Sequence, residues 1–341
     1  MQQTHQKLER ILFFDGIAIF CIVVFHELIR YPQNPFSSLT PYLVAMGLSL
    51  FTFSSGYKLM INHAGDISRK DFLGDYYLTR FVRLYKPYIG YTVLTVVPLI
   101  VITYLAIHII NLDFPTGTIF TRLLESANIF GILSFLGGVN PIADQLWYLV
   151  ALLVIISVSF TILYFLNVRW FFLSFIPLLI ISLLIQSSVI QGGNILNFFT
   201  YAPLFIAGCF WAYKNDWSQI SHYCLAVLFL IFIAISAIVP AVQSIGIYLS
   251  CFVFPMFLFS LPDAVNKTPF IYPFLMFCGT YSFQIYLFHQ PLILHILSTG
   301  IIDILKINYF FMPVIVSILT IYCCVAVYRL TKAIHLNVIF E

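Results

Sequence analysis

Long apolar runs, separated by short gaps rich in proline, glycine and charged residues, occupy almost the whole chain. A membrane-crossing helix needs about 20 predominantly apolar residues, and counting runs of that length predicts about ten spans. The bilayer core offers the backbone no hydrogen-bond partner, and the runs lack the strict alternation of barrel strands, so we expect helices. The expected limits are residues 11–29, 41–61, 87–110, 143–165, 171–190, 196–213, 220–239, 244–261, 272–296 and 308–330.

The expected fold class is therefore all-α, a single polytopic domain over residues 1–341 in the cell membrane, with the lipid bilayer around it. Only 9% of the residues are charged and the net charge is +3, which excludes a nucleic-acid-binding surface. The seven cysteines form no C-x-x-C pair, so neither a disulfide framework nor a metal site is expected. The first run lacks a small-residue cleavage site and is interpreted as a retained helix. The stretch 116–139 is expected to lie along the interface or to re-enter the membrane.

Lysine and arginine predict the orientation of the spans, because they favour the cytoplasmic side of a membrane. The loop expected at residues 62–86 holds five of them. The same side would carry Lys7, Arg10, Arg169, Lys214, Lys267, Arg329 and Lys332, and the opposite side little beyond Arg30, Arg122 and Lys306. Both termini are therefore expected in the cytoplasm, which requires an even number of spans.

His26 and its neighbour Glu27 stand near the outer end of the first span. Ionisable groups within spans are costly and usually functional, and imidazole titrates near neutral pH, so His26 is a candidate general base. The structural alternative is a helix-end histidine that meets interfacial water. Asp15 precedes His26 by eleven residues. The two share a helix face but lie about 16 Å apart by helical rise, so they do not touch.

His289 lies in the ninth expected span at a depth comparable to that of His26, and Pro291 after it should disturb the helical hydrogen bonds. Its structural alternative is a buried histidine bonded to a backbone carbonyl. Gln284 and Tyr281 place further polar groups one to two turns inward, so a polar lane is predicted along this helix.

Two other groups of residues have both a structural and a functional interpretation. Ser54, Ser55 and Gly56 either let two helices approach closely or form a narrow passage for a ligand near the cytoplasmic face. Trp147 and Gln145, beside Asp144 at the start of the fourth span, either belong to an interfacial belt or contact a polar acceptor.

Arg80 and Arg83 lie one helical turn apart and present one cationic face. If these residues served only to orient the spans, lysine would be equally suitable at both positions. Two guanidinium groups at this spacing suit phosphate oxygens better, through bidentate hydrogen bonds. Both interpretations, an orientation signal and an anion-binding site, remain open at this point.

Five segments in order resemble the membrane acyltransferase-3 family, whose members are O-acyltransferases of cell-surface sugars. These segments are "FDGIAIFCIVVFH", "LFTFSSGYKL", "YYLTRFVRLYKPYIGY", "QLWYLVALL" and "YSFQIYLFHQPLI". They are similar to the family's first span ending in histidine, its Ser-Gly-aromatic triplet, its Arg-x-x-Arg segment, its Leu-Trp-aromatic-Leu segment and its late Tyr-Leu-x-His-x-Pro segment. One position departs from the pattern: the family commonly has arginine eleven residues before the histidine, where this chain has Asp15.

The resemblance implies cytoplasmic acyl-coenzyme A, in the simplest case acetyl-coenzyme A, as a co-substrate and no tightly bound cofactor. Arg80 and Arg83 would hold its phosphates, and its thin arm would pass Ser54 and Gly56. His26, oriented by Glu27, would deprotonate a hydroxyl of a surface or lipid-linked saccharide. The residues expected to contact this acceptor are His289, Trp147, Gln145, Tyr281 and Gln284.

Two alternatives remain. The same polar lane and broken helices would serve a transporter or flippase for a lipid-linked saccharide. The substitution at Asp15 also keeps open a catalytically silent relative.

Overall fold

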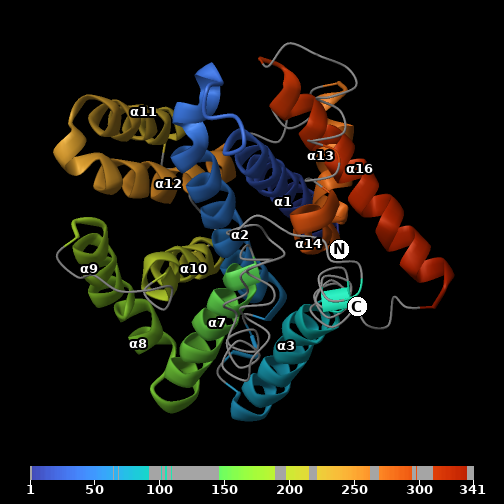
Figure 1. Ribbon diagram of the computed structural model, residues 1–341. Coiled ribbons are helices and arrows are strands. Elements are labelled where there is room, and N and C mark those ends of the chain that lie inside the picture. Colours follow the sequence, from blue (N-terminus) through green and yellow to red (C-terminus); the bar gives the residue numbers. More distant parts are fainter. Residues whose placement is uncertain are drawn as a thin grey trace.

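The structure is a computed structural model that describes residues 2–63, 65–67, 69–91, 101, 104, 105, 109, 146–188, 197–214, 221–261, 269–293, 297 and 310–335. Within these ranges every element is helical, and Figure 1 shows how the helices are arranged. The elements are α1 (Gln2–Leu28), η1 (Pro35–Leu39), α2 (Thr40–His63), α3 (Lys70–Tyr91), α7 (Trp147–Phe165), α8 (Val168–Leu173), α9 (Phe175–Gln186), α10 (Asn197–Lys214), α11 (His222–Ile238), η5 (Pro240–Val242), α12 (Gln243–Ser260), α13 (Ile271–Thr280), α14 (Ser282–Phe288), η7 (His289–Ile293) and α16 (Met312–Ala333).

The described ranges contain 6 helical segments that are long and apolar enough to cross a membrane. They are Leu8–Leu28, Pro35–His63, Trp147–Phe165, Val168–Gln186, Pro240–Ser260 and Met312–Ala333. His222–Ile238 and Ile271–Thr280 are shorter apolar helices. The predicted class, an all-helical multi-pass membrane protein, agrees with this. The count of ten spans and the side of the termini stay predictions, and the stretch 116–139 lies outside the described residues.

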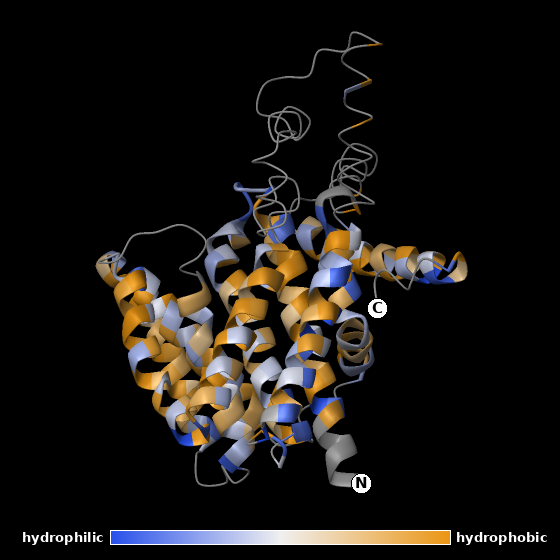
Figure 2. Ribbon diagram, turned by 90° about the horizontal axis from the view of Figure 1, so that it is seen from below, coloured by the Kyte–Doolittle hydropathy of each residue, from blue (hydrophilic) through white to orange (hydrophobic). Residues whose placement is uncertain are grey.

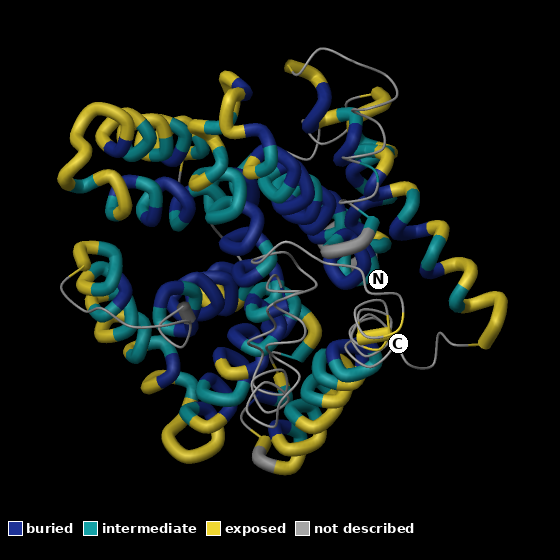
Figure 3. Tube along the Cα trace, viewed as in Figure 1, coloured by how far each residue is buried: buried dark blue, intermediate teal, exposed yellow. Residues whose placement is uncertain are grey.

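The centre of the bundle is built by α1 and α2, and the outer helices turn apolar side chains away from it. Phe14, Ile19 and Val23 of α1 are fully buried, and so is Phe53 of α2. Figure 3 shows α1 and the middle of α2 largely in the buried colour, while α9, α11 and α16 carry many exposed positions. Apolar residues dominate most helices, as Figure 2 shows. An apolar surface on outer helices is what lipid contact requires.

Two pairs of glycines, Gly16 with Gly279 and Gly56 with Gly208, bring the central helices into direct backbone contact. A Cβ at Gly16 would lie 1.9 Å from the Leu275 carbonyl oxygen, and one at Gly279 would lie 1.7 Å from that of Leu12. Gly56 meets α10 in the same way, because a Cβ there would lie 2.1 Å from the Phe205 oxygen. Small residues at helix crossings are typical of membrane bundles. These contacts fix the register of α1 on α13 and of α2 on α10.

Two predicted elements differ from the structure. The basic residues expected in a loop at 62–86 lie mostly inside α3, which runs without interruption from Lys70 to Tyr91. The ninth expected span is divided into α13, α14 and η7, with Gln290 extended at φ −121° and ψ 157°. A residue that precedes proline is pushed out of the helical region, so the break follows from Pro291, as the sequence predicts.

Candidate functional site

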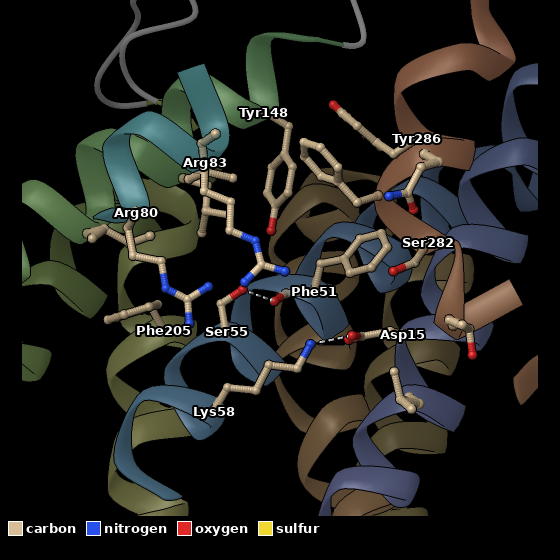
Figure 4. A pocket seen from close by; sticks show the side chains of 18 of the residues that line it. Asp15, Phe51, Ser55, Lys58, Arg80, Arg83, Tyr148, Phe205, Ser282 and Tyr286 are labelled. Atoms are coloured by element: carbon tan, nitrogen blue, oxygen red, sulfur yellow. Dashed lines mark hydrogen bonds and ion pairs between the residues drawn. The ribbon is translucent and has the colours of Figure 1, made fainter. Parts of the chain in front are cut away.

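A cavity of about 430 Å³, which we call the basic cavity, lies between α1, α2, α3, α7 and the start of α14. Its charged lining residues are Asp15, Lys58, Arg80 and Arg83, and Ser55 also lines it. Figure 4 shows the two arginines reaching in from α3 toward Ser55, with Lys58 and Asp15 facing each other below. The remaining lining residues are Leu12, Phe51, Tyr76, Leu84, Tyr148, Leu152, Ile156, Phe160, Phe205, Gly279, Thr280, Ser282, Phe283, Gln284 and Tyr286. Three cations and one carboxylate make this an anion-attracting space.

Arg80 and Arg83 both line the basic cavity, as their spacing on one helix face predicts. The Nε of Arg80 donates to the Tyr76 hydroxyl at 2.8 Å, and its guanidinium lies 5.0 Å from the centre of that ring. Burial raises the pKa of Tyr76, so the phenol keeps its proton and accepts this bond as a neutral group. The contact fixes Arg80 through one edge of its guanidinium and leaves further N–H donors for a ligand.

Lys58 is a residue of this cavity that the sequence interpretation missed. It forms an ion pair with Asp15, whose side chain is only 4% exposed. The second oxygen of that carboxylate, Oδ1, is buried and has no hydrogen-bond partner in the described part of the chain. Arg10, the nearest basic residue before Asp15, instead donates to the carbonyl oxygens of Leu258 and Leu261 at the end of α12. The sequence does contain a signal for Lys58, because a lysine inside the predicted span 41–61 is a charged residue within a membrane segment.

The three small residues of α2 considered for a passage, Ser54, Ser55 and Gly56, have different surroundings. Of this triplet only Ser55 lines the basic cavity. Gly56 packs against the α10 backbone, and Ser54 is fully buried. Gly56 thus packs closely against α10, and the member of this triplet that lines the basic cavity is Ser55, while a ligand passage stays a prediction.

A second cavity of about 370 Å³, which we call the histidine cavity, lies along the C-terminal half of α1. Its wall contains His26 and Arg30 from α1, Trp147 from α7, and Tyr286 and Gln290 from the broken helix. Ile22, Phe25, Ile29, Val44 and Leu48 complete the wall. It follows the basic cavity along α1, because Asp15 lines the first and His26 the second.

His26 and His289 are brought together, although they lie at opposite ends of the sequence. Their ring centres are 5.1 Å apart. His289 is completely buried and is not among the residues that line the histidine cavity, so its contact with an acceptor stays a prediction. Glu27 is also buried, and its charge acts on Arg30: burial lowers the pKa of that guanidinium, and Glu27 opposes the shift. An orienting role of Glu27 toward His26 stays a prediction.

Two tyrosines stand where the cavities approach each other. Tyr286 lines both of them, while Tyr148 lines the basic cavity and its neighbour Trp147 the histidine cavity. The Tyr148 and Tyr286 rings are 6.1 Å apart. Thr52 donates to the Leu48 carbonyl oxygen at 2.8 Å, and its hydroxyl is also hydrogen-bonded to the Tyr148 hydroxyl at 2.8 Å. That bond holds Tyr148 in the wall between the two spaces.

The remaining predicted acceptor residues are distributed differently. Trp147 lines the histidine cavity, whereas Gln284 lines the basic cavity. Tyr281 is on the wall of neither; Arg329 of α16 donates to its hydroxyl at 3.4 Å. Gln145 lies outside the described residues.

Within the described ranges no group of three or more His, Cys, Asp or Glu side chains is arranged to hold a metal ion. The geometry places a cation-lined space beside a space that contains an imidazole, with Tyr286 in the wall of both. Such a pair of spaces suits a charged donor and a neutral nucleophile that meet between them.

A family model described as an acyltransferase domain, that of the acyltransferase-3 family, matches residues 11–329 of the chain. No curated protein and no solved structure matches it. The matched residues include every side chain named for the two cavities.

Proposed function

Because this chain belongs to the acyltransferase-3 family and is a membrane acyltransferase, we propose that it is an O-acyltransferase of saccharides. It would move an acyl group, in the simplest case acetyl, from acyl-coenzyme A to a hydroxyl of a surface or lipid-linked saccharide. The observation that carries the proposal is the pair of adjoining cavities, one cationic and one containing His26, with Tyr286 in the wall of both.

The basic cavity supports the donor half of the proposal. Coenzyme A carries several phosphate charges, and the guanidinium groups of Arg80 and Arg83 bind phosphate oxygens in a bidentate manner. Lys58 adds a point charge on the opposite wall. The thin pantetheine arm would extend from these cations past Ser55 toward Tyr148 and Tyr286. We place this cavity on the cytoplasmic side, where the basic residues of α3 favour it.

The histidine cavity supports the acceptor half. Trp147 offers a flat apolar face and Gln290 an amide, a combination that suits the two faces and the hydroxyl rim of a sugar ring. His26 stands in the same wall and is the titratable side chain placed to accept a proton from a sugar hydroxyl.

The reaction that this arrangement supports is a direct acyl transfer. His26 takes the proton of the sugar hydroxyl as the oxygen attacks the thioester carbonyl carbon. The carbon–sulfur bond breaks, and the coenzyme A thiolate leaves and takes the proton back from His26. Holding both substrates at one point makes the attack effectively intramolecular, which is a large part of what an enzyme contributes.

The test is purified protein in proteoliposomes, incubated with labelled acetyl-coenzyme A and candidate surface glycans. The proposal predicts labelled glycan that appears only when both substrates and active protein are present. A transporter or flippase would instead move glycan across the bilayer without any acyl donor. Glycan movement without donor, together with no label transfer for any acceptor, would replace the proposal by that alternative.

A further inference from the structure

His289 opens η7, directly after α14, and both of its ring nitrogens are buried. Its Nδ1 lies 2.8 Å from the Tyr286 carbonyl oxygen and 3.1 Å from that of Ile285. A carbonyl has no proton to give, so Nδ1 must carry the hydrogen. These two bonds stand where the helix breaks, directly before the extended Gln290. The Nδ1–H of His289 therefore has its hydrogen-bond acceptors within its own chain segment.

The surroundings of the other ring nitrogen of His289, Nε2, differ from those of Nδ1. In a neutral imidazole whose Nδ1 is protonated, Nε2 is a bare acceptor. Here Nε2 is buried and has no hydrogen-bond partner in the described part of the chain. A buried acceptor without a partner is costly, and in folded proteins such groups commonly mark a functional role. The neighbouring ring with a titratable N–H is that of His26, with its centre 5.1 Å away on another helix.

We infer that His289 is a positioning residue for His26, whose single N–H it accepts at Nε2. A neutral imidazole has one N–H and one lone pair, and the partner of one nitrogen decides the state of the other. Once the N–H of His26 is directed to His289, the remaining nitrogen of His26 is the basic one, and it is the nitrogen left for the histidine cavity. A separation of 5.1 Å between the ring centres allows two ring nitrogens that face each other to lie within hydrogen-bond distance.

The inference rests on the proposed function and adds one step to it. When His26 takes the hydroxyl proton it becomes an imidazolium with two N–H groups, one directed to the substrates and one to Nε2 of His289. The lone pair of Nε2 stabilises this charge without receiving the proton. The proton then returns from His26 to the coenzyme A thiolate, so His289 is neutral at the start and at the end.

The matched variants are His289→Asn and His289→Gln, because each keeps one half of the imidazole. The Asn amide reaches the position of Nδ1 and keeps the donor to Tyr286, but offers nothing toward His26. The Gln amide reaches the position of Nε2 and keeps an acceptor for His26, while it loses the bond to Tyr286. A structural role predicts that Asn is the better replacement, and a positioning role predicts that Gln is.

The first readout does not depend on activity. In protein with ¹⁵N-labelled histidine, the ring nitrogens of His26, identified by their loss in His26→Ala, should report one tautomer in the native protein and in His289→Gln. In His289→Asn they should report a mixture of both tautomers. A His26 tautomer that is the same in all three proteins would overturn the inference, whether or not the chain transfers acyl groups.

The second readout is the acyl-transfer rate at saturating acetyl-coenzyme A. We expect His289→Asn to lower it about 10- to 100-fold, with donor affinity unchanged, and His289→Gln to retain most of it. Equal rates in the two variants would also overturn the inference. If native protein transfers no label at all, the proposed function fails instead, and the tautomer measurement still decides the pairing of the two histidines.

Discussion

At the scale of single residues, the ion pair of Asp15 and Lys58 joins α1 to α2 in the wall of the basic cavity. A carboxylate that is 4% exposed in an apolar bundle needs an opposite charge beside it. Lys58 supplies that charge, and its side chain, 30% exposed, still reaches the cavity. The pair therefore offsets the negative charge of Asp15, so that Arg80 and Arg83 determine the cationic character of the basic cavity.

Replacing Lys58 by Met should destabilise the protein, because it leaves the Asp15 carboxylate buried without its cation. We expect a loss of about 3 kcal/mol in the free energy of unfolding. The double variant Asp15→Asn with Lys58→Met should recover most of that loss, since it removes both charges. Thermal unfolding in detergent measures the effect, with Lys214→Met on the exposed end of α10 as the control. Equal stability of Lys58→Met and the native protein would show that the pair is not needed.

At the scale of elements, helix crossings without room for a side chain hold the cavity in shape. Gly279 lies at the crossing of α13 with α1 and also lines the basic cavity. Ser282 and Tyr286 of the following α14 line the same cavity, so a shift of α13 would displace that wall.

A methyl group at Gly279 should therefore reduce both stability and donor binding. The added Cβ would lie 1.7 Å from the Leu12 carbonyl oxygen, so α1 and α13 must move apart. We expect Gly279→Ala to cost about 2 kcal/mol, within the range of overpacked cores. Gly74→Ala on α3 is the control, because a Cβ there meets no atom within 4 Å, and alanine favours a helix. If Gly279→Ala and Gly74→Ala unfolded at the same temperature, the close crossing at Gly279 would not be needed for stability.

The elements that can be predicted from the sequence are those that are determined by their own residues and not by contacts with distant segments. The first two predicted spans, 11–29 and 41–61, correspond closely to Leu8–Leu28 and Pro35–His63, because a long apolar run leaves a membrane helix few alternatives. By contrast, α3 was expected as a loop. Its mixture of charged and aromatic residues is not a membrane-crossing pattern, and its helix is supported by packing, as the burial of Tyr88 and Tyr91 shows.

The same division applies to the site. Arg80 and Arg83 share a face because three residues make almost one helical turn, which a sequence reveals directly. The pairing of Lys58 with Asp15, and the choice of Ser55 over Ser54 as the lining residue, depend on how α2 is rotated against α1 and α10. That rotation is set by contacts such as Gly56 on Phe205, between residues far apart in the chain.

At the scale of the whole molecule, the two cavities follow one another along the central helices. The cationic one is formed around Asp15 and Lys58, and the one with the imidazole lies about three helical turns further along α1, about 16 Å by helical rise. Donor and acceptor would thus enter from opposite sides and meet near Tyr286. In such an arrangement donor binding and acyl transfer would take place at different points of the molecule. Variants in the basic cavity should therefore lose donor affinity, and variants in the histidine cavity should lose the transfer step.

The most direct test measures, on the same samples, the affinity for acetyl-coenzyme A and the single-turnover rate of acyl transfer at saturating donor. His26→Ala should bind donor like the native protein and transfer no acyl group. The double variant Arg80→Lys with Arg83→Lys should bind donor about 10- to 100-fold more weakly and still transfer at high donor concentration, because lysine keeps the charge but not the bidentate hydrogen bonds. Arg169→Lys, on the exposed end of α8, is the control. Acyl transfer at the native rate by His26→Ala, or donor affinity unchanged in the double arginine variant, would contradict this account.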